Sequence, residues 1–452
     1  MIEPIALSSE ESKQSCVVPR MYEQSSGSLL VPAQYRKDEA SPLYASNACV
    51  TCLPAALEHG EAFSAMARVP RKRPENFASL PIGIRAEYLK QLEEVYVPTR
   101  DLAMLQTQLM SVLRGSYLHR DPNTAEFQRK LWRLFGSGDP VGIARPFESA
   151  SPSGGVVLYG PTGIGKTTAE DRFISYVGYY GRVHTSLGGK ACWWPQAAIV
   201  RVNASGCPSV KQLASGIAAQ LDRLVGSNLA VKVGRSSNHT LTVSRILSSN
   251  LVGMLFVDDM QIWSRVNYKL RIEMLDFLVG VLEETGIPII CSGTFLLKRV
   301  LEENLSQTEK LMSQGEIILG PVLNDFDVRS ICAAMWQQNI SSNEVAMPEW
   351  FPVEVKNHTA GVRRWIREFC AFLFLKMAID NVTIPTQIYV RTIAHTALRP
   401  QQEPVAILNH AFIGKRVNDD LLQKYEEYIS KDVYRKLVAE RDRYFRQMKA
   451  AV

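Results

Sequence analysis

The chain has 452 residues, a net charge of +6 and 46% hydrophobic residues, which is ordinary for a soluble globular protein and allows one large module with extensions or two or three compact units. No run approaches the roughly 18 apolar residues of a membrane span, and Met1–Glu10 lacks a basic stretch followed by an apolar one. We therefore expect a cytoplasmic protein, whose mild positive charge permits a nucleic-acid partner without requiring one.

Residues 1–75 show no sustained apolar period and are rich in Ser, Ala, Pro and Glu. This composition predicts a flexible tail that docks a partner. Cys49 and Cys52 form a CxxC spacing within it, with Cys16 before them and His59 after them. All four are zinc ligands by type, but a single CxxC without a second matched pair also fits two cysteines in a loose segment. The sequence leaves both alternatives open.

Residues 76–150 form a predicted helical extension. Leucines recur three and four residues apart between Leu102 and Leu113, which places them on one face of a helix. Gly115 and Pro122 mark the break after this helix, and a second helix is expected over 124–135.

Residues 151–323 form a predicted α/β core. Short apolar runs alternate with longer helical stretches, a pattern that indicates a parallel sheet with helices on both faces. The expected strands are Val156–Tyr159, Ala197–Val202, Met254–Val257, Ile287–Cys291 and Ile317–Leu319, and the expected helices between the earlier ones are Lys166–Tyr176, Val210–Val225 and Leu270–Glu284.

A small helical lid is expected over residues 324–398, because that segment is mostly helical in pattern. A linker and a helical tail follow over residues 399–452. In the tail, apolar and aromatic side chains recur four apart on one helical face, at Tyr425, Ile429, Val433 and Leu437.

The clearest motif joins the first expected strand of the core to its first helix. Gly160-Pro-Thr-Gly-Ile-Gly-Lys166-Thr167 satisfies the P-loop pattern G-x-x-x-x-G-K-[ST] in full. Its glycines let backbone N–H groups turn inward around phosphates. We expect Lys166 to reach the β- and γ-phosphates of ATP and the Thr167 hydroxyl to hold Mg²⁺. The predicted nucleotide-binding residues are Gly160, Pro161, Thr162, Gly163, Ile164, Gly165, Lys166, Thr167 and Thr168.

The second half of such a site needs acidic side chains at the end of a buried strand. Met254–Val257 is followed directly by Asp258 and Asp259. We expect Asp258 to act on the metal and Asp259 to polarise the attacking water. Two acids that merely end a strand are the alternative, which the P-loop upstream disfavours.

Several short blocks together resemble the TnsC/TniB branch of the AAA+ ATPases. The resemblance covers roughly residues 80–430 and is specific in combination, although each block is short. The blocks are Val112–Pro122, Gln220–Asn228, Asp258–Gln261, and Gly286-Ile-Pro followed by Gly293-Thr294.

The resemblance implies an AAA+ fold with a five-stranded parallel sheet and a bacterial, ATP-dependent regulator of DNA transposition. Such regulators assemble as rings or helical filaments on duplex DNA without sequence preference, associate with the nucleoid there, and are disassembled by hydrolysis. They link a target-selection protein, in some systems a CRISPR effector, to transposase subunits. In this branch a polar residue after the sensor strand and a lid arginine approach the γ-phosphate, which implies Thr294, with Ser292 as the second choice, and Arg364.

Two departures from the family pattern stand out. The water-polarising acid is usually Glu, and here it is Asp259, one methylene shorter. Where relatives have an arginine-rich stretch, this chain has Leu305–Lys310, which leaves Arg299 or Lys310 as the candidates for a trans-acting finger. We therefore expect slow hydrolysis that depends on DNA or a partner.

By the same analogy, DNA contacts should lie in loops that line the pore of a ring. The candidates, which would meet phosphates, are Lys211, Lys232, Arg235 and Thr240. Two other functions stay open: an ATP-binding oligomeric scaffold with little hydrolysis, and another DNA-associated AAA+ ATPase such as a helicase-loader relative.

Overall fold

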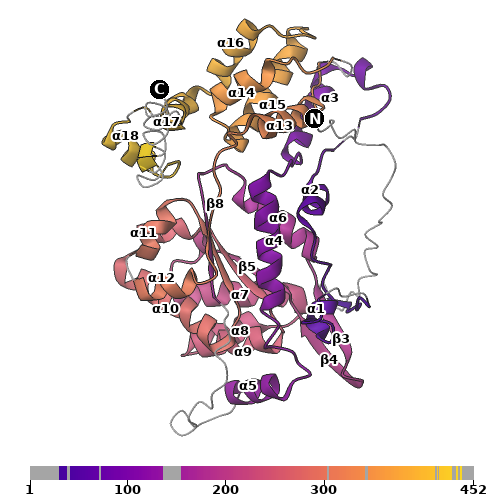
Figure 1. The fold of residues 1–452 in the computed structure, drawn as a ribbon, viewed down its shortest axis with the longest axis vertical. Coiled ribbons are helices and arrows are strands. Elements are labelled where there is room, and N and C mark those ends of the chain that lie inside the picture. The colour runs from indigo at the N-terminus through magenta and orange to yellow at the C-terminus, as the bar shows by residue number, and fades with distance from the viewer. Residues whose placement is uncertain are drawn as a thin grey trace, which may run out of the picture.

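The computed structural model shows an α/β core and a helical body that lies above it in the view of Figure 1. A long helix, α4 (Arg100–Gly115), runs along the core toward that body. The residues that the structure describes are 30–37, 41–70, 73–135, 154–302, 305–341, 345–412, 415, 417–429, 434–435 and 438–439.

The core is built on a sheet of five strands in the order β5-β6-β7-β2-β8. Every neighbouring pair in it is parallel, which confirms the predicted five-stranded parallel sheet. β2, β6 and β7 are buried along their whole length, as expected for strands covered on both faces. The strands are β2 (Val156–Tyr159), β5 (Ile199–Asn203), β6 (Met254–Asp258), β7 (Ile289–Gly293) and β8 (Glu316–Ile318).

Helices cover the two faces of this sheet. Alternate strand residues such as Val157 and Leu255 pack against α7, α9, α10 and α11, whereas Leu158 and Phe256 pack against α6 and α4. The core helices are α6 (Lys166–Val177), α7 (Val210–Val225), α8 (Leu229–Gly234), α9 (His239–Ser249), α10 (Tyr268–Thr285), α11 (Leu296–Glu302) and α12 (Leu305–Leu311), with 3₁₀ turns η3 (Ala204–Gly206) and η4 (Met260–Arg265).

The described part of residues 1–75 is folded onto the core, which corrects the predicted flexible tail. Cys49, Val50 and Leu53 are buried beside α4 and α6, because the sheet face that α6 covers needs further apolar cover. The elements are too short to show a period in the sequence. They are β1 (Leu30–Pro32), α1 (Ala48–Thr51) and α2 (His59–Met66).

A β-hairpin that the sequence analysis did not predict is inserted between α6 and β5. Its strands β3 (Gly181–Leu187) and β4 (Lys190–Gln196) are antiparallel, and β1 pairs with β3 in parallel. Gly188 and Gly189 form the turn with φ of 55° and 77°, which glycine adopts without a steric penalty. A register shift in β3 breaks the alternation that would have predicted the hairpin.

The helical extension contacts both parts of the molecule. α4 packs on the core, whereas Phe77 and Leu92, earlier in the extension, pack on the lid. The extension therefore joins the two bodies. Its elements are η1 (Phe77–Ser79), α3 (Ile82–Glu87), η2 (Tyr88–Glu93), α4 and α5 (Ala125–Phe135).

The lid is helical, as predicted, and the described tail packs into it. Leu422 and Ile429 are buried in the lid cluster, so residues 399–429 are not a separate unit. The predicted tail helix is wrong at its start, because α18 ends at Lys424 and residues 425–429 are not helical. Farther along, the described residues 434–435 and 438–439 are helical, while Val433 and Leu437 lie outside the described residues. The elements are α13 (Asp325–Trp336), α14 (Phe351–Thr359), α15 (Arg363–Ile379), α16 (Gln387–Ala397), η5 (Arg399–Gln401), α17 (Gln402–Phe412) and α18 (Asp419–Lys424).

Within the described ranges, no helix has both the length and the apolar character that crossing a bilayer would take.

Candidate nucleotide-binding site

The P-loop connects the end of β2 to the first turn of α6. Gly163 and Gly165 have φ of 79° and 100°, a backbone region that favours glycine, so the loop closes around its own N–H groups. A side chain at Gly160 would also collide with the backbone, since its Cβ would lie 2.1 Å from the carbonyl oxygen of Leu319. Thr162, Gly163, Gly165, Lys166, Thr167 and Thr168 line a pocket, and Gly160, Pro161 and Ile164 are buried behind it.

Lys166 is the cation at the centre of the loop. Its Nζ donates to the carbonyl oxygens of Gly160 and Pro161, both at 2.9 Å, so the ammonium group is held within the loop. Burial lowers the pKa of Lys166 to about 8, although the nearby carboxyl of Asp258 opposes that shift. The negative charge of a bound phosphate would raise this pKa again.

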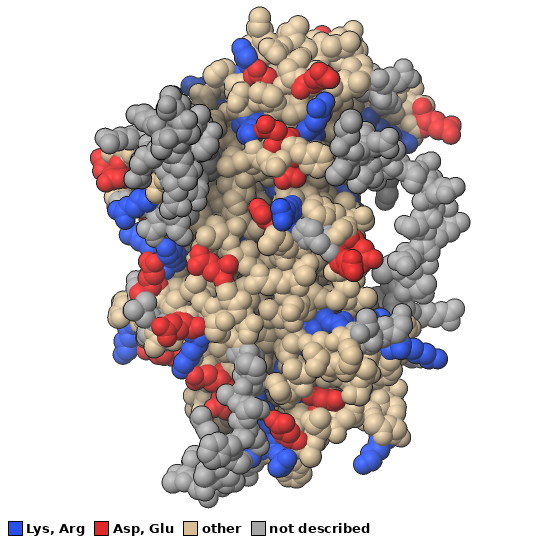
Figure 2. Space-filling model, viewed as in Figure 1, with Lys and Arg blue, Asp and Glu red and all other residues tan. Residues whose placement is uncertain are grey.

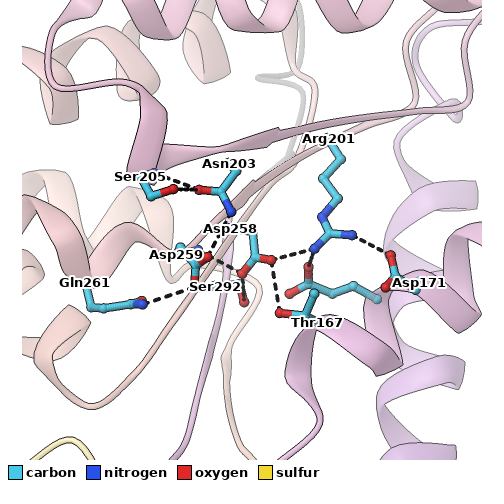
Figure 3. A network of polar contacts seen from close by, with 10 residues as sticks. Thr167, Asp171, Arg201, Asn203, Ser205, Asp258, Asp259, Gln261 and Ser292 are labelled. Atoms are coloured by element: carbon cyan, nitrogen blue, oxygen red, sulfur yellow. Dashed lines mark hydrogen bonds and ion pairs between the residues drawn. The ribbon is translucent and has the colours of Figure 1, made fainter. Parts of the chain in front are cut away.

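Asp258 lies at the end of β6 with four donors around it (Figure 3). Its Oδ1 accepts from Ser292 Oγ at 3.1 Å and from the Asp259 backbone N–H at 2.8 Å. Its Oδ2 accepts from Thr167 Oγ1 at 3.2 Å and from Arg201 Nη2 at 2.5 Å. A hydroxyl and a carboxylate side by side at the P-loop are the oxygen ligands that Mg²⁺ uses together with phosphates, so Thr167 and Asp258 fit this ion.

Asp259 has a strained backbone, with φ of 58° in the left-handed region. Both of its carboxylate oxygens accept hydrogen bonds from amides: Oδ2 from Asn203 Nδ2 at 2.8 Å, and Oδ1 from Gln261 Nε2 at 3.0 Å (Figure 3). The sequence motifs alone give neither amide a role. Asn203 could have been found, because it ends β5 and pairs with Asp258 across the parallel ladder.

The two candidates for the γ-phosphate sensor have different surroundings. Ser292 is fully buried, and its hydroxyl donates to Asp258. Thr294 lines the pocket, and its Oγ1 is buried without a hydrogen-bond partner among the described residues. An unpaired hydroxyl facing the pocket is available to a phosphate oxygen, so the geometry favours Thr294, the first choice of the sequence analysis.

Three lid arginines line the same pocket: Arg363, Arg364 and Arg367. The backbone N–H of Arg364 donates to the carbonyl oxygen of Gly163 at 2.9 Å, which joins the lid directly to the P-loop. Arg363 donates from Nη1 to the carbonyl oxygen of Val97 at 2.8 Å and is thereby held by the extension. The side chain of Arg364 is exposed at the pocket and available to a phosphate, as its predicted role requires.

The pocket has a volume of about 230 Å³ and differs in character from end to end. Its polar end is the P-loop, with Asp259 and Thr294. Its other end carries apolar side chains from the extension and the lid, which suits a flat base. Those side chains are Val95, Tyr96, Val97, Ile331 and Met335.

An ionic cluster lies behind Asp258, one of the two expected ligands of Mg²⁺. Arg201 of β5 contacts Asp258, and its guanidinium also lies 2.6 Å from Asp171 and 3.4 Å from Glu170. Burial raises the pKa of Glu170 to about 8, and the charge of Asp258 adds to the shift. The sequence motifs do not reveal this cluster, although a charged residue within the apolar strand run Ala197–Val202 is a usable signal for it.

The predicted DNA-binding residues divide into two groups. Lys211 on α7, Lys232 on α8 and Arg235 at the end of α8 are exposed. Thr240 is a poorer candidate, because its side chain packs on α10: a Cβ placed at Gly280 would lie 2.9 Å from Thr240 Cγ2.

Both candidates for a trans-acting finger form ion pairs within the chain. Arg299 Nη1 lies 3.1 Å from Glu426, and Lys310 Nζ lies 2.5 Å from Glu283. Each side chain is about half exposed or more, at 60% and 49%, so each could reach a neighbouring molecule after breaking its pair.

The candidate zinc ligands do not form a metal cluster within the described residues. Cys52 donates from Sγ to Gln196 Oε1 at 2.9 Å, and Cys49 is fully buried. Cys16 and the side chain of His59 lie outside what the structure describes. Both described cysteines are therefore parts of the packed core.

Comparisons with known proteins match a stretch of the core to a known family. Residues 148–311 match the family model described as "Bacterial TniB protein", which confirms the predicted TnsC/TniB resemblance there. No curated protein matches the chain. Domain III of the Thermotoga maritima replication initiation protein DnaA is 14% identical with a TM-score of 0.35, covering 57% of this chain and 88% of that one. A Walker-type ATPase of Pyrococcus abyssi is 12% identical with a TM-score of 0.36, covering 64% and 91%.

Proposed function

Since residues 148–311 carry a TniB-type AAA+ ATPase core, we propose that the chain is an ATP-dependent regulator of DNA transposition. It assembles on duplex DNA, links a target-selection protein to the transposase, and is released by hydrolysis. The observation that carries the ATP-dependent part is the pairing of Thr167 with Asp258 beneath a P-loop that the lid contacts through Arg364. The family match carries the transposition part.

The site residues support phosphoryl transfer by position and charge. Lys166 and the loop N–H groups would hold the phosphates, and Thr167 and Asp258 would hold Mg²⁺, which supplies positive charge between phosphates. Asp259 would orient the attacking water, with Thr294 and Arg364 near the γ-phosphate. Both oxygens of Asp259 already accept hydrogen bonds, which makes the carboxylate a weaker acceptor for the proton of water. We therefore expect slow ATP turnover.

DNA binding is proposed to require assembly. On the face drawn in Figure 2, basic and acidic side chains are interspersed rather than gathered in one basic patch. A single subunit with a net charge of +6 is a modest match for a polyanion. Several subunits that bring Lys211, Lys232 and Arg235 to one duplex would add weak contacts through effective concentration.

A second candidate function is an ATP-binding scaffold with little hydrolysis. The amides of Asn203 and Gln261 on Asp259 favour it, because they occupy the oxygens that would polarise water. ATP turnover with and without duplex DNA separates the two candidates, since only the regulator should show turnover that DNA or a partner accelerates.

The proposed function is tested by fluorescence anisotropy of a labelled random duplex with an ATP analogue, with ADP and without nucleotide. We expect cooperative binding with the analogue alone and a steep loss with salt, because each neutralised phosphate releases counterions. The triple variant Lys211→Ala/Lys232→Ala/Arg235→Ala should lose DNA binding and keep nucleotide affinity, whereas Arg129→Ala on α5 should keep both. Tight binding by monomers without nucleotide would contradict the assembly proposal.

A further inference from the structure

Arg201 beside the nucleotide site lies on β5, whose buried residues are all apolar. Arg201 pairs with Phe256 of β6 across the parallel ladder, and only 24% of its side chain is exposed. A strand covered on both faces does not need a cation for packing, and a buried charge is stable only with partners. The partners of Arg201 therefore indicate what it does.

Those partners are three carboxyl groups, and Figure 3 labels Asp258 and Asp171 among them. Arg201 Nη2 lies 2.5 Å from Asp258 Oδ2 and 3.4 Å from Glu170 Oε2, and Nη1 lies 2.6 Å from Asp171 Oδ1. The side chains of Asp258 and Glu170 are 2% and 0% exposed, whereas that of Asp171 is 47% exposed. The two shorter contacts thus run from the buried Asp258 to the solvent-facing Asp171.

The contact with Asp258 falls on the oxygen that the metal would need. Oδ1 of Asp258 is taken by Ser292 and by the backbone N–H of Asp259. Oδ2 is the oxygen next to Thr167 Oγ1, the other expected metal ligand, and Arg201 occupies that same oxygen. A divalent cation that approaches Asp258 Oδ2 and Thr167 Oγ1 therefore meets the positively charged guanidinium of Arg201.

We propose that Arg201 is a resident counter-cation of the metal site, which competes with the divalent metal for Oδ2 of Asp258 and prevents the nucleotide-free protein from holding the metal alone. Metal binding then depends on the phosphates of the nucleotide, whose negative charge compensates for the resident arginine. The inference deepens the proposed nucleotide site and rests on its assignment of Thr167 and Asp258.

The structure also offers a second position for the displaced guanidinium. Both carboxylate oxygens of Glu170 are buried and accept no hydrogen bond from any described residue. Glu170 and Asp171 are neighbours on α6, the helix that starts at the P-loop. Arg201 can therefore leave Asp258 and remain paired on α6, so its exchange with a metal does not strand a buried charge.

The test is Mn²⁺ binding to the nucleotide-free full-length chain, measured as loss of the free-ion electron paramagnetic resonance signal. Arg201→Gln should bind Mn²⁺ about tenfold more tightly than the unchanged protein, because the competing charge is gone. Arg201→Lys keeps a cation there and should bind weakly. Arg223→Gln removes an exposed arginine of α7 and controls for net charge, so it should leave Mn²⁺ binding unchanged.

Arg201→Gln leaves the buried Glu170 without its cation, so the double variant Arg201→Gln/Glu170→Gln is measured beside it, with unfolding curves to show that each is folded. Tighter Mn²⁺ binding by either folded variant supports the proposal. Binding no tighter than in the unchanged protein overturns it. Binding of a fluorescent ATP analogue is measured separately, and its absence in the unchanged protein would contradict the proposed nucleotide site instead.

Discussion

Asn203 Nδ2 donates to Asp259 Oδ2 at 2.8 Å, and this bond joins the ends of two neighbouring parallel strands, β5 and β6. Gln261 Nε2 occupies the other oxygen of the same carboxylate. The orientation of the proposed water-polarising acid is therefore set by an amide that belongs neither to the P-loop nor to the strand that carries the acid.

Replacing Asn203 by Ala should raise basal ATP turnover several-fold. The change frees Oδ2 of Asp259 and leaves Gln261 on Oδ1, and a carboxylate oxygen that accepts no hydrogen bond from an amide is a better acceptor for the proton of water. Asn203 also accepts a hydrogen bond from Ser205, so a loss of about 1 kcal/mol in stability is expected. Steady-state phosphate release measures the turnover, and Ser205→Ala, which keeps the amide on Asp259, is the control. Turnover equal to or below that of the unchanged protein would show that the amide helps catalysis.

The affinity for nucleotide should fall as pH rises above about 8. Burial lowers the pKa of Lys166 to about 8, and only the ammonium form attracts phosphates. The terminal phosphate is already ionised above pH 7.5, so Lys166 is the titrating group that would contact the phosphates. We expect a loss of about tenfold per pH unit above the pKa of Lys166. Titration of a fluorescent nucleotide between pH 7 and 9.5 measures it, and a flat profile would contradict the lowered pKa.

The sequence predicted the core well because buried parallel strands are read directly from composition. Val156–Tyr159 and Val210–Val225 are β2 and α7 with the same bounds. A strand that is covered on both faces is a continuous apolar run, and the glycine or acidic residues on either side of the run mark where the strand begins and ends. Once β2 and β6 are predicted, the positions of the P-loop after β2 and of the two acids at the end of β6 are predicted with them.

Other features depend on contacts between distant segments. α1 and β1 are four and three residues long, so no local period marks them. α1 is buried beside α4 and α6, and β1 is held by its parallel pairing with β3. Arg201, Asn203 and Glu170 are brought together by strand order and helix packing, which a linear motif does not encode.

Glu170→Gln should stabilise the nucleotide-free protein at alkaline pH. Burial raises the pKa of Glu170 from its ordinary 4.5 to about 8, so between those values the folded state holds a proton that the unfolded state has lost. Stability from this group is present below pH 4.5 and is lost as pH rises through 8. We expect little difference between the two proteins at pH 5 and a gain of about 2 kcal/mol for the variant at pH 8.5. Urea unfolding without metal at both pH values measures it, and an equal difference at both would contradict the prediction.

Arg120→Met should destabilise the fold by about 3 kcal/mol, because it strips donors from buried carbonyl oxygens. Arg120 is 2% exposed and lies in the block Val112–Pro122 that carries the family resemblance. Its Nη1 donates to the carbonyl oxygen of Val252 at 2.7 Å, and its Nε donates to that of Ser116 at 2.7 Å. The arginine thus ties the end of α4 to the turn that leads into β6.

The residues around the contact between Arg120 and the turn before β6 are tightly packed. A Cβ at Gly253 would lie 2.6 Å from the hydroxyl of Tyr117, which itself donates to the carbonyl oxygen of Leu251 at 2.7 Å. Urea unfolding should show the loss in Arg120→Met and a change of less than about 0.5 kcal/mol in Arg129→Met, an exposed arginine on α5. Nucleotide affinity should be unchanged in the folded variant, because neither Arg120 nor its partners line the pocket. A stable variant with lost nucleotide binding would instead give this block a direct role in the site.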